Sequence, residues 1–564
     1  MTAPAYDLLE QPWLRVRTLE GEIQEVSLRE IFRRSGEIAD LAGESASQNF
    51  AVFRVLVAIL IRAIRSQGLE DDPVDLWQEQ LADGSFRDQV DAYLVSHRLR
   101  FDLFHPETPF MQVADLRTKK GSYDTAAQLI PDVGPGLFST RTRTDADILA
   151  PAEAARWLIR VHAYDVSGIK SGAVGDDRVR SGKGYPIGTG WTGAVGGIQI
   201  VGPTLADSLF LNLPVDALEE GEDPWADDLP PWERIPDGPA PRFMDESRPN
   251  GIVDILTWQQ RRVRLWPGAD GKVHRVLITN GDRVARANTF VDPMTGYRFS
   301  AAQSKKGIST FYPKTHDPDL TVWRGIEGLF AAHGPFARAA KGSDREPDKR
   351  AETLVQIDDT LADAIHEHFG SATVGLRLVG AVYGTQDAVL VAEIEDSIPV
   401  SIGLLGPEGR EIRMEAVEAA ALVMRYRGSF QWFLKQLAYS GGDSPDGAPA
   451  GPTEAWLVEL EQEFRQWLSR FQEHIEPLNA AAAWRESMKR VTLRHIAAAV
   501  QAAGPRAAVG RIGENESGSG ILHSSARYET WAQGKLKELI DPQTTGTRSA
   551  TAPTHSAHDA RGDD

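Results

Sequence analysis

The chain has 564 residues, a length that favours two or three domains because a domain typically holds ~150 residues. Hydrophobic residues make up 41% and charged residues 25% of the sequence, a globular mixture that excludes wholesale disorder, collagen and a membrane bundle. There is no cysteine, which excludes disulfides, thiolate metal sites, iron–sulfur clusters and cysteine nucleophiles. The formal net charge of −19 is unlike a general nucleic-acid coater, although a local basic patch could still bind nucleic acid.

The N-terminal part of the chain predicts a hairpin followed by helices. Two short runs within residues 13–26 flank a Glu-Gly turn and indicate a β-hairpin. Ser27 and Glu30 form a capping-box pattern that predicts a helix. The most apolar stretch, Phe50 to Ile64, is too short for a membrane span and contains Arg54 and Arg62, so we expect residues 47–66 to form a buried core helix. Residues 73–100 look helical again. With no secretory signal at the start, a soluble cytoplasmic protein is expected.

A glycine-rich region covers residues 165–202, where eleven glycines predict loops with close backbone approaches. Within it, residues 188–193 match the G-x-G-x-x-G dinucleotide fingerprint. That fingerprint requires a following helix, whereas residues 196–201 predict a loop and then a strand. Gly182-Lys183 lacks the rest of a phosphate-binding P-loop. A nucleotide site in this region is therefore disfavoured.

The histidines give no convincing active site. His366 and His368 are two residues apart and would face different sides of a helix, so a solvated helix face is favoured over a zinc site. His105, His162 and His316 are isolated in the sequence, and a structural role is favoured for each. We therefore expect no catalytic residue, no metal and no cofactor.

The charge is segregated along the middle of the chain. Residues 212–249 hold eight prolines and eleven acidic residues, which predicts an exposed, extended excursion. Between Asp254 and Arg286 the sequence has seven Lys or Arg against three Asp, and Lys305-Lys306 add another basic point. We expect these basic residues to share one electropositive face, away from the excursion. The strand residues expected on this basic face are Arg261, Arg262, Arg264 and Arg275.

The last third of the chain predicts a hairpin and then helices. Residues 374–383 and 388–394 flank Gly384-Thr-Gln-Asp387, a strong β-hairpin signal with a polar tip. Four helical segments follow; they cover residues 409–439, 456–475, 480–503 and 522–540. The expected fold is α+β, with a large mixed domain of β-hairpins and Gly-rich loops and a C-terminal four-helix bundle. The expected boundaries are 1–404 for the mixed domain, 405–540 for the bundle and 541–564 for a disordered polar tail.

These segments, in this order, resemble the CasA-type large subunit of the type I-E CRISPR surveillance complex, Cascade. The resemblance is carried by five stretches distributed along the chain. They are Glu10-Gln-Pro-Trp-Leu-Arg-Val16, Thr108-Pro-Phe-Met-Gln112, Leu209-Phe-Leu-Asn-Leu213, Leu256-Thr-Trp-Gln-Gln-Arg-Arg-Val-Arg-Leu265 and Tyr312-Pro-Lys-Thr-His-Asp-Pro318. With the hairpin and the helices that follow, the resemblance covers about residues 6 to 540.

The resemblance implies a non-enzymatic subunit that recognises the protospacer-adjacent motif (PAM) in double-stranded DNA. Such a subunit helps to start unwinding and R-loop formation, and it recruits the helicase-nuclease that degrades the target. The implied partners are target DNA, the 5′ handle of the CRISPR RNA, the other Cascade subunits (backbone, handle-binding and small) and the helicase-nuclease, with no membrane. Sequence itself is recognised by base pairing to the guide, as in other RNA-guided systems.

The resemblance also implies site residues. A glycine loop corresponds to Gly182, Lys183 and Gly184, and a lysine finger to Lys305 or Lys306. A glutamine wedge corresponds to Thr385, Gln386 and Asp387, where Asp387 would cap the turn instead of facing phosphates. The contact with the RNA handle corresponds to Phe138, Arg141 and Arg143.

General physics agrees with these roles. Glycine lets a backbone approach a narrow groove without a Cβ, and a hairpin is a stiff mount for a tip that parts a base pair. Two alternatives stay open from the sequence: a nucleotide-binding enzyme that uses the Gly-rich region 182–193, and a pure assembly scaffold that reads no DNA.

Overall fold

The computed structural model describes residues 5–67, 72–131, 147–218, 227–244, 247–305, 307–330, 346–444, 450–471, 477–514 and 520–541. The chain divides into two compact units. The first unit is Met1–Val417 with Leu468–Ile475, and the second is Glu418–Trp467 with Glu476–Asp564. The first unit mixes helices with small antiparallel sheets, and the second is mainly helical, in agreement with the expected α+β class.

The N-terminal hairpin and its capped helix are present as predicted. Strands β1 (Leu14–Thr18) and β2 (Ile23–Val26) pair antiparallel, and β3 (Ile38–Leu41) adds to the other edge of β1. Helix α1 (Leu28–Arg33) begins after Ser27, and Ser27 and Glu30 exchange both capping-box hydrogen bonds. Local sequence therefore sets both the turn and the start of the helix.

Helix α2 (Ala46–Arg65) forms the core of the first unit. It is long and apolar enough to cross a membrane by length and composition alone, yet 89% of its most apolar stretch is buried inside the protein. Buried Arg54 forms an ion pair with Asp292 at 2.9 Å, so even a charged residue in the middle of the helix faces protein. The predicted core helix is confirmed. The helical region after it is two helices, α3 (Pro73–Asp83) and α4 (Phe86–Ser96), because Gly84 ends α3 with φ +73°.

The middle of the first unit consists of short elements around two small sheets. The elements are β4 (Asp124–Thr125), α6 (Pro151–Tyr164), β5 (Lys170–Ser171), β6 (Lys183–Gly184), β7 (Gly197–Val201), α7 (Leu205–Leu211), α8 (Ile252–Leu256), β8 (Arg261–Pro267) and β9 (Val273–Asn280). One sheet has the order β4-β9-β8, and β5 pairs with β6. A loop and then strand β7 follow the G-x-G-x-x-G segment, as predicted.

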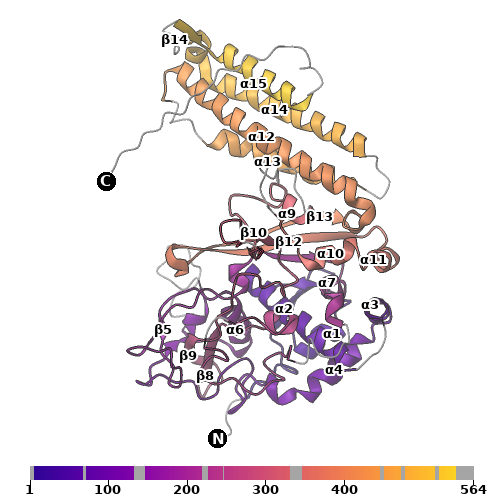
Figure 1. The fold of residues 1–564 in the computed structure, drawn as a ribbon, viewed down its shortest axis with the longest axis vertical. Helices are drawn as coiled ribbons and strands as arrows, with labels where there is room; N and C mark the ends of the chain where they lie inside the picture. Colours follow the sequence, from indigo (N-terminus) through magenta and orange to yellow (C-terminus); the bar gives the residue numbers. More distant parts are fainter. Residues whose placement is uncertain are drawn as a thin grey trace. The chain divides into compact units, whose positions relative to one another are not determined.

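A long hairpin dominates the end of the first unit. Before it come β10 (Tyr297–Phe299), β11 (Phe311–Pro313), α9 (Glu327–Phe330), α10 (Glu352–Asp358) and α11 (Ala362–Phe369). Strands β12 (Thr373–Tyr383) and β13 (Leu390–Ser401) then pair along their whole length, and β7 joins the other edge of β12. Figure 1 shows β12 and β13 side by side, with their tip on the side of the molecule where β5 lies. The predicted hairpin is confirmed and is longer than expected.

The predicted exposed excursion over residues 212–249 is wrong for its described part. Trp232 is only 2% exposed, and Asp228 is fully buried. Asp228 forms an ion pair with Arg65 at 3.1 Å, and Glu233 forms one with Arg62 at 2.5 Å. Asp228 and Glu233 therefore neutralise two arginines of α2 instead of facing solvent.

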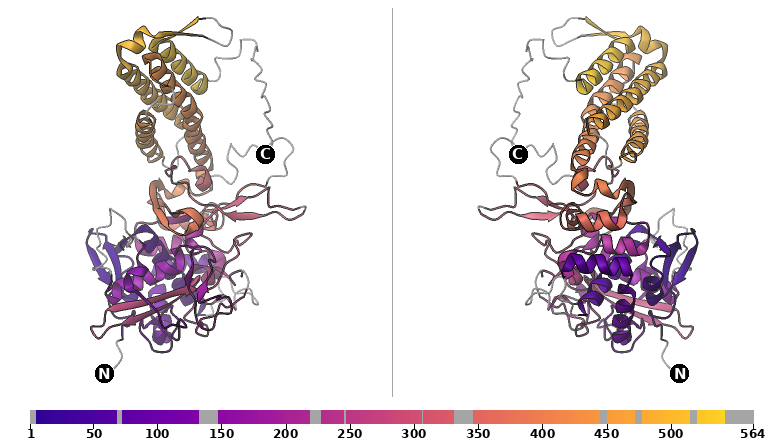
Figure 2. Two further views of the ribbon diagram at one scale, coloured as in Figure 1. Left: turned by 90° about the vertical axis from the view of Figure 1, so that its left-hand side faces the viewer. Right: turned by 90° about the vertical axis from the view of Figure 1, so that its right-hand side faces the viewer.

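Four helices make up most of the second unit: α12 (Arg410–Gly441), α13 (Gly451–Leu468), α14 (Pro477–Val509) and α15 (Ser525–Ile540). A short hairpin of β14 (Arg511–Glu514) and β15 (Gly520–His523) connects α14 to α15. The Trp456 indole donates to Thr492 Oγ1 at 3.0 Å, which ties α13 to α14. The Tyr426 hydroxyl donates to the carbonyl of Ala532 at 2.8 Å, which ties α12 to α15. In both views of Figure 2 the orange and yellow helices of this unit run alongside one another.

Candidate nucleic-acid interface

The tip of the β12–β13 hairpin presents Thr385 and Gln386 to solvent. The Gly384 N–H donates to the carbonyl of Val389 at 2.8 Å and closes the turn. Gln386 has φ +58° and Asp387 has φ +54°, in the left-handed region that non-glycine residues rarely adopt. Strained backbone of this kind persists only where the surroundings determine it, and it clusters at functional sites. The tip is therefore a fixed turn with an exposed glutamine.

The hairpin is fastened to α2, α6 and the segment after α6. The Tyr383 hydroxyl donates to the carbonyl of Tyr164 at 2.8 Å. Along β13, the Glu393 carboxylate accepts from Ser47 Oγ at 2.5 Å and from Arg160 at 3.1 Å. Both strands are thus tied to helices of the core. These contacts hold the hairpin in a fixed position relative to α2 and α6.

The predicted glycine loop contains a two-residue β-turn at Ser181 and Gly182, directly before β6. Arg180 and Lys183 exchange two backbone hydrogen bonds of 3.0 Å around Ser181 and Gly182. Both central residues have positive φ (53° and 74°), as a type I′ turn requires. Gly182 and Lys183 are exposed, and a Cβ on Gly182 would meet no atom within 4 Å. Open space in front of a bare backbone is compatible with the close approach of a ligand.

Gly184 is different from its neighbours, because it is buried. A Cβ added there would lie 2.9 Å from Nδ2 of Asn280, whose side chain donates to the carbonyl of Tyr185. The missing side chain at Gly184 therefore serves packing inside the protein. Of the two glycines predicted to face DNA, only Gly182 is positioned to do so in this conformation.

The glycine turn and the hairpin tip are connected through the segment from Asp165 to Ser171. The Ser167 N–H donates to the carbonyl of Asp387 in the tip at 2.8 Å. A few residues later, Lys170 and Ser171 pair with Gly184 and Lys183. Four residues of extended chain span at most roughly 14 Å, so two elements distant in sequence lie close together. The structure therefore brings together two of the predicted elements.

The predicted lysine finger lies in the turn between β10 and β11. Lys305 is exposed, and its backbone exchanges hydrogen bonds of 3.0 and 2.8 Å with Ile308. Lys306 lies outside the described residues. The base of this hairpin is tied to the start of β7, where the Gly196 N–H donates to the carbonyl of Lys314 at 2.7 Å. Within the described part of the chain, no hydrogen bond joins the Lys305 turn to the glycine turn or to the hairpin tip.

A cavity of about 630 Å³ opens beside the hairpin tip. Its lining includes Leu390 of β13, Asp165 and Val161. Pro131 and Asp147 also line it, and these two residues flank the segment predicted to contact the RNA handle. Phe138, Arg141 and Arg143 themselves lie outside the described residues, so their predicted role stays a prediction.

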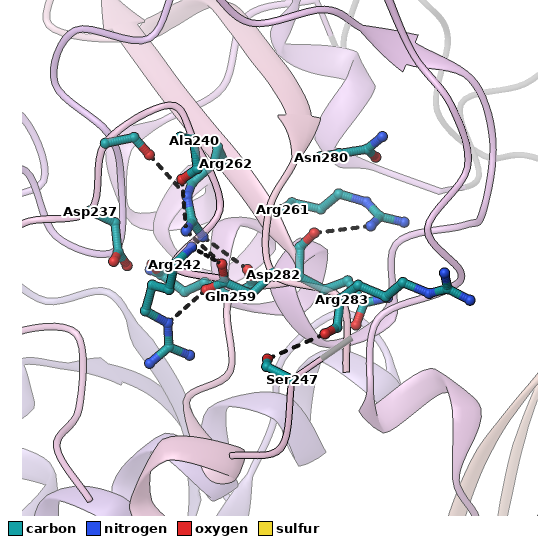
Figure 3. A network of polar contacts seen from close by, with 12 residues as sticks. Asp237, Ala240, Arg242, Ser247, Gln259, Arg261, Arg262, Asn280, Asp282 and Arg283 are labelled. Atoms are coloured by element: carbon teal, nitrogen blue, oxygen red, sulfur yellow. Dashed lines mark hydrogen bonds and ion pairs between the residues drawn. The ribbon is translucent and has the colours of Figure 1, made fainter. Parts of the chain in front are cut away.

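The predicted basic face is wrong for Arg261 and Arg262, which are each 1% exposed. Arg261 forms an ion pair with Asp165 at 2.5 Å. Arg262 and Arg242 converge on Asp282, at 2.9 and 2.8 Å (Figure 3). These guanidinium groups are neutralised inside the protein and are not available to a polyanion.

Arg264 and Arg275 stay candidates for the basic face. Arg264 is partly buried, and burial lowers the pKa of its guanidinium. Its Nε and Nη1 have no hydrogen-bond partner within the described residues. Arg275 is exposed, and its guanidinium stacks over Tyr123 at 4.6 Å and Trp266 at 6.0 Å. Stacking leaves the edge of a guanidinium free to bind an anion.

Sequence reasoning missed a basic turn next to the glycine turn. Lys119 and Lys120 are exposed, and Thr118 in the same turn forms a β-bridge with Ala173, two residues after β5. The signal was available as Arg117-Thr-Lys-Lys-Gly121, a basic run that ends in glycine. These cations extend the positive charge near Lys183.

Two of the three glycines of the dinucleotide-like segment, Gly190 and Gly193, leave room for atoms of other parts of the protein. A Cβ at Gly190 would lie 2.2 Å from the carbonyl oxygen of Ala163, and one at Gly193 would lie 2.0 Å from the Tyr383 hydroxyl. These two glycines permit α6 and β12 to pack closely, so their bare backbone is used inside the protein and not for a phosphate. Among the residues that the structure describes, no group of three or more His, Asp or Glu is arranged to hold a metal.

Comparison with known proteins agrees with the resemblance. The profile of CRISPR-associated protein Cse1 matches residues 7–495. The CasA/Cse1 protein of Thermus thermophilus is 27% identical over 426 residues, which covers 74% of this chain and 75% of that protein. The crystal structure of Thermobifida fusca Cse1 has 33% identity and a TM-score of 0.81, and covers 95% of this chain and 98% of that one.

A second crystal structure, Cse1 from Acidimicrobium ferrooxidans, has 26% identity and a TM-score of 0.75, with coverage of 95% and 98%. The fold is also shared with a chain of a CRISPR RNA-guided surveillance complex, at 21% identity and a TM-score of 0.66, over 94% of this chain and 99% of that one. The profile match spans most of the sequence, and the matched structures cover nearly all of it. This chain belongs to the CRISPR-associated Cse1 family, the CasA-type large subunits of type I-E Cascade.

Proposed function

We propose that this chain is the large, non-catalytic subunit of a CRISPR RNA-guided surveillance complex and that it recognises the PAM in double-stranded DNA. It helps to start unwinding and R-loop formation, and it recruits the helicase-nuclease that degrades the target. The observation that carries the proposal is the link between the exposed Gly182 turn and the exposed Gln386 tip through the segment from Asp165 to Ser171. A groove-contacting element and a wedge need such a fixed spacing.

In this proposal the Gly182 turn approaches the minor groove with its bare backbone. The minor groove presents a degenerate pattern that mainly separates A·T from G·C pairs, so several related PAM sequences would be accepted. Lys183 and Lys305 supply positive charge for phosphates, and Arg275 and Lys119 extend it. Gln386 then enters the base stack next to the PAM, where unstacking one step costs a few kcal/mol.

The other parts of the chain take assembly roles in the same proposal. The segment with Phe138, Arg141 and Arg143 contacts the 5′ handle of the CRISPR RNA, next to the cavity beside the tip. Helices α12 to α15 form a four-helix bundle whose outer faces meet other Cascade subunits, because most of their aromatic residues are buried inside the unit. Guide RNA and invading DNA meet in the cytoplasm, which is the location that goes with this role.

The experiment compares two targets for the assembled complex: a fully paired PAM-bearing duplex, and one whose first protospacer pairs are already mismatched. Thr385→Ala with Gln386→Ala should weaken stable binding to the paired target and should matter much less on the pre-opened one. The unpairing cost has been removed in advance on the second target. The matched control is Ser66→Ala with Gln67→Ala, an exposed pair at the end of α2, which should change neither.

Substitution of Gly182 by Val tests the other element. It should weaken binding to both targets, because it blocks the approach to the groove before any opening occurs. If the tip and turn variants both bind like the unmodified complex, the chain is an assembly scaffold that reads no DNA. If the tip variant is equally impaired on both targets, Gln386 is a binding contact and not a wedge.

A further inference from the structure

Asp165 forms ion pairs with two cations from different elements, in a site with little exposure to solvent. Its Oδ2 lies 2.5 Å from Nε of Arg261 on β8 and 2.6 Å from Nζ of Lys170 on β5. The side chains of Asp165, Lys170 and Arg261 are 11%, 9% and 1% exposed. We call these three residues the Asp165 cluster. These side chains expose too little surface for a direct role in binding DNA, and their ion pairs connect the end of α6 to β5 and β8.

Arg261 holds more than the carboxylate. Its Nη2 donates to the carbonyl of Val166 at 2.9 Å and to the carbonyl of Gly188 at 2.8 Å. The guanidinium thus joins the start of the segment that follows α6 to the glycine-rich region after β6. A buried guanidinium with several acceptors is a rigid connector, because its planar fork fixes the geometry of each bond.

The segment that starts at Asp165 contacts both candidate DNA-contacting elements. Ser167, two residues after Asp165, donates to Asp387 in the hairpin tip. Lys170, at the other end of the same segment, pairs with Gly184 beside the glycine turn. Burial raises the pKa of Asp165, but the charges of Arg261 and Lys170 outweigh it, so the pKa lies below its usual value and the carboxylate is ionised.

We propose that Asp165, with Arg261 and Lys170, is a positioning residue that couples the Gly182 turn to the Gln386 tip. Contact of the turn with the duplex is then transmitted to base-pair opening at the tip. This inference rests on the proposed function of the two elements. It concerns residues that touch no DNA, and it predicts a defect in opening and not in docking.

Neutralising the carboxylate tests the coupling. Asp165→Asn keeps the size of the side chain but leaves two buried cations without a counter-charge, so the segment between turn and tip relaxes. In the assembled complex, Kd for the fully paired target should rise about tenfold, while Kd for the pre-opened target stays within about twofold. The ratio of the two affinities is the readout, because a loss of folded protein lowers both equally.

The matched control is Glu233→Gln. Glu233 is buried to a similar degree, with 11% of its side chain exposed, and it forms an ion pair with Arg62 at 2.5 Å. It lies in a different part of the first unit and has no contact with the segment from Asp165 to Ser171 among the described residues. Its substitution should lower the melting temperature yet leave the affinity ratio unchanged.

Lys170→Met is a second test of the coupling between the turn and the tip, for the case in which Asp165→Asn does not fold. It removes one cation and leaves the Asp165–Arg261 pair intact, so it should change the affinity ratio in the same direction and by less. An unchanged ratio for a folded Asp165 or Lys170 variant, while the Gln386 variant still loses opening, would overturn the coupling alone. An unchanged ratio for the Gln386 variant as well would overturn the proposed function itself.

Discussion

The hydroxyl of Tyr383, at the end of β12, donates to the carbonyl of Tyr164, at the end of α6, at 2.8 Å. The same hydroxyl occupies the place where a side chain at Gly193 would lie, 2.0 Å from a Cβ there. One contact therefore explains a glycine in the dinucleotide-like segment and fastens the base of the hairpin tip. Burial raises the pKa of Tyr383 well above its usual value, so the hydroxyl keeps its proton and stays a donor.

Tyr383→Phe removes this donor and keeps the ring. Because the Tyr164 carbonyl is then left without this partner, the free energy of unfolding should fall by about 1 kcal/mol. The measurement is denaturant unfolding of the full chain. The control is Tyr312→Phe. The Tyr312 hydroxyl has no hydrogen bond within the described residues, so its removal should change the free energy of unfolding little. Equal effects of the two substitutions would contradict a specific role for the Tyr383 hydrogen bond.

Local sequence patterns predicted the hairpin tip correctly, but they predicted wrongly that Arg261 and Arg262 of β8 are exposed. The tip is encoded in a few neighbouring residues, since Gly384 and its polar neighbours separate two alternating runs. Arg261 and Arg262 were assigned to one exposed face, although successive residues of a strand point to opposite faces. Their counter-charges, Asp165 and Asp282, are distant in the sequence, and only the tertiary structure brings them together.

The prediction that residues 212–249 form an exposed acidic excursion failed for the same reason, because the charge partners are distant in the sequence. Many prolines and acidic residues are typical of exposed chain, yet Asp228 and Glu233 pair with the arginines of α2. A local sequence pattern shows that burying a charge would be costly, but it does not show whether a distant segment supplies an opposite charge. The Asp165 cluster could not be predicted for that reason, because Arg261 is distant in the sequence from Asp165 and Lys170. The basic turn with Lys119 and Lys120 could have been predicted from its run of cations.

The salt dependence of DNA binding should reveal which cations reach phosphates. Each phosphate neutralised contributes a slope of roughly 0.9 in the logarithm of the binding constant against the logarithm of salt concentration. Lys183→Ala and Arg275→Ala should each reduce this slope by up to that amount in the assembled complex. Arg262→Met is the matched change at a buried cation; it should lower the melting temperature and leave the slope unchanged. A reduced slope for Arg262→Met would place that guanidinium on the DNA and contradict its burial.

Asp282→Asn should destabilise the first unit strongly. The carboxylate is fully buried between Arg242 and Arg262, and its neutralisation leaves both guanidinium groups without full compensation. Breaking a buried ion pair from one side costs about 3–5 kcal/mol, which thermal unfolding of the full chain would report as a lowered melting temperature. Asp270→Asn, at an exposed aspartate beside His274, is the control and should leave the melting temperature unchanged. A melting temperature of Asp282→Asn equal to that of the unmodified chain would mean that hydrogen bonding alone suffices at this site.

Stability should fall as the pH drops below 6.5, in part because of His162. Burial lowers the pKa of His162 to about 4, and the nearby charges of Arg262 and Arg261 act in the same direction. The ordinary pKa is 6.5, so between pH 6.5 and pH 4 the unfolded chain binds a proton that the folded chain excludes. The contribution of neutral, buried His162 to the free energy of unfolding is therefore complete above pH 6.5. It is lost as the pH falls toward 4, by roughly 3 kcal/mol in total.

His162→Gln isolates this contribution. The ring nitrogen Nε2 of His162 lies 2.9 Å from the carbonyl oxygen of Met111, and a glutamine amide offers a donor to the same carbonyl without titrating. The free energy of unfolding of the variant, measured by urea unfolding at several pH values, should decline less steeply between pH 6.5 and 4.5 than that of the unmodified chain. Other groups titrate equally in both proteins, so the difference between the two curves belongs to His162. Parallel curves over this range would mean that His162 keeps its ordinary pKa in the folded protein.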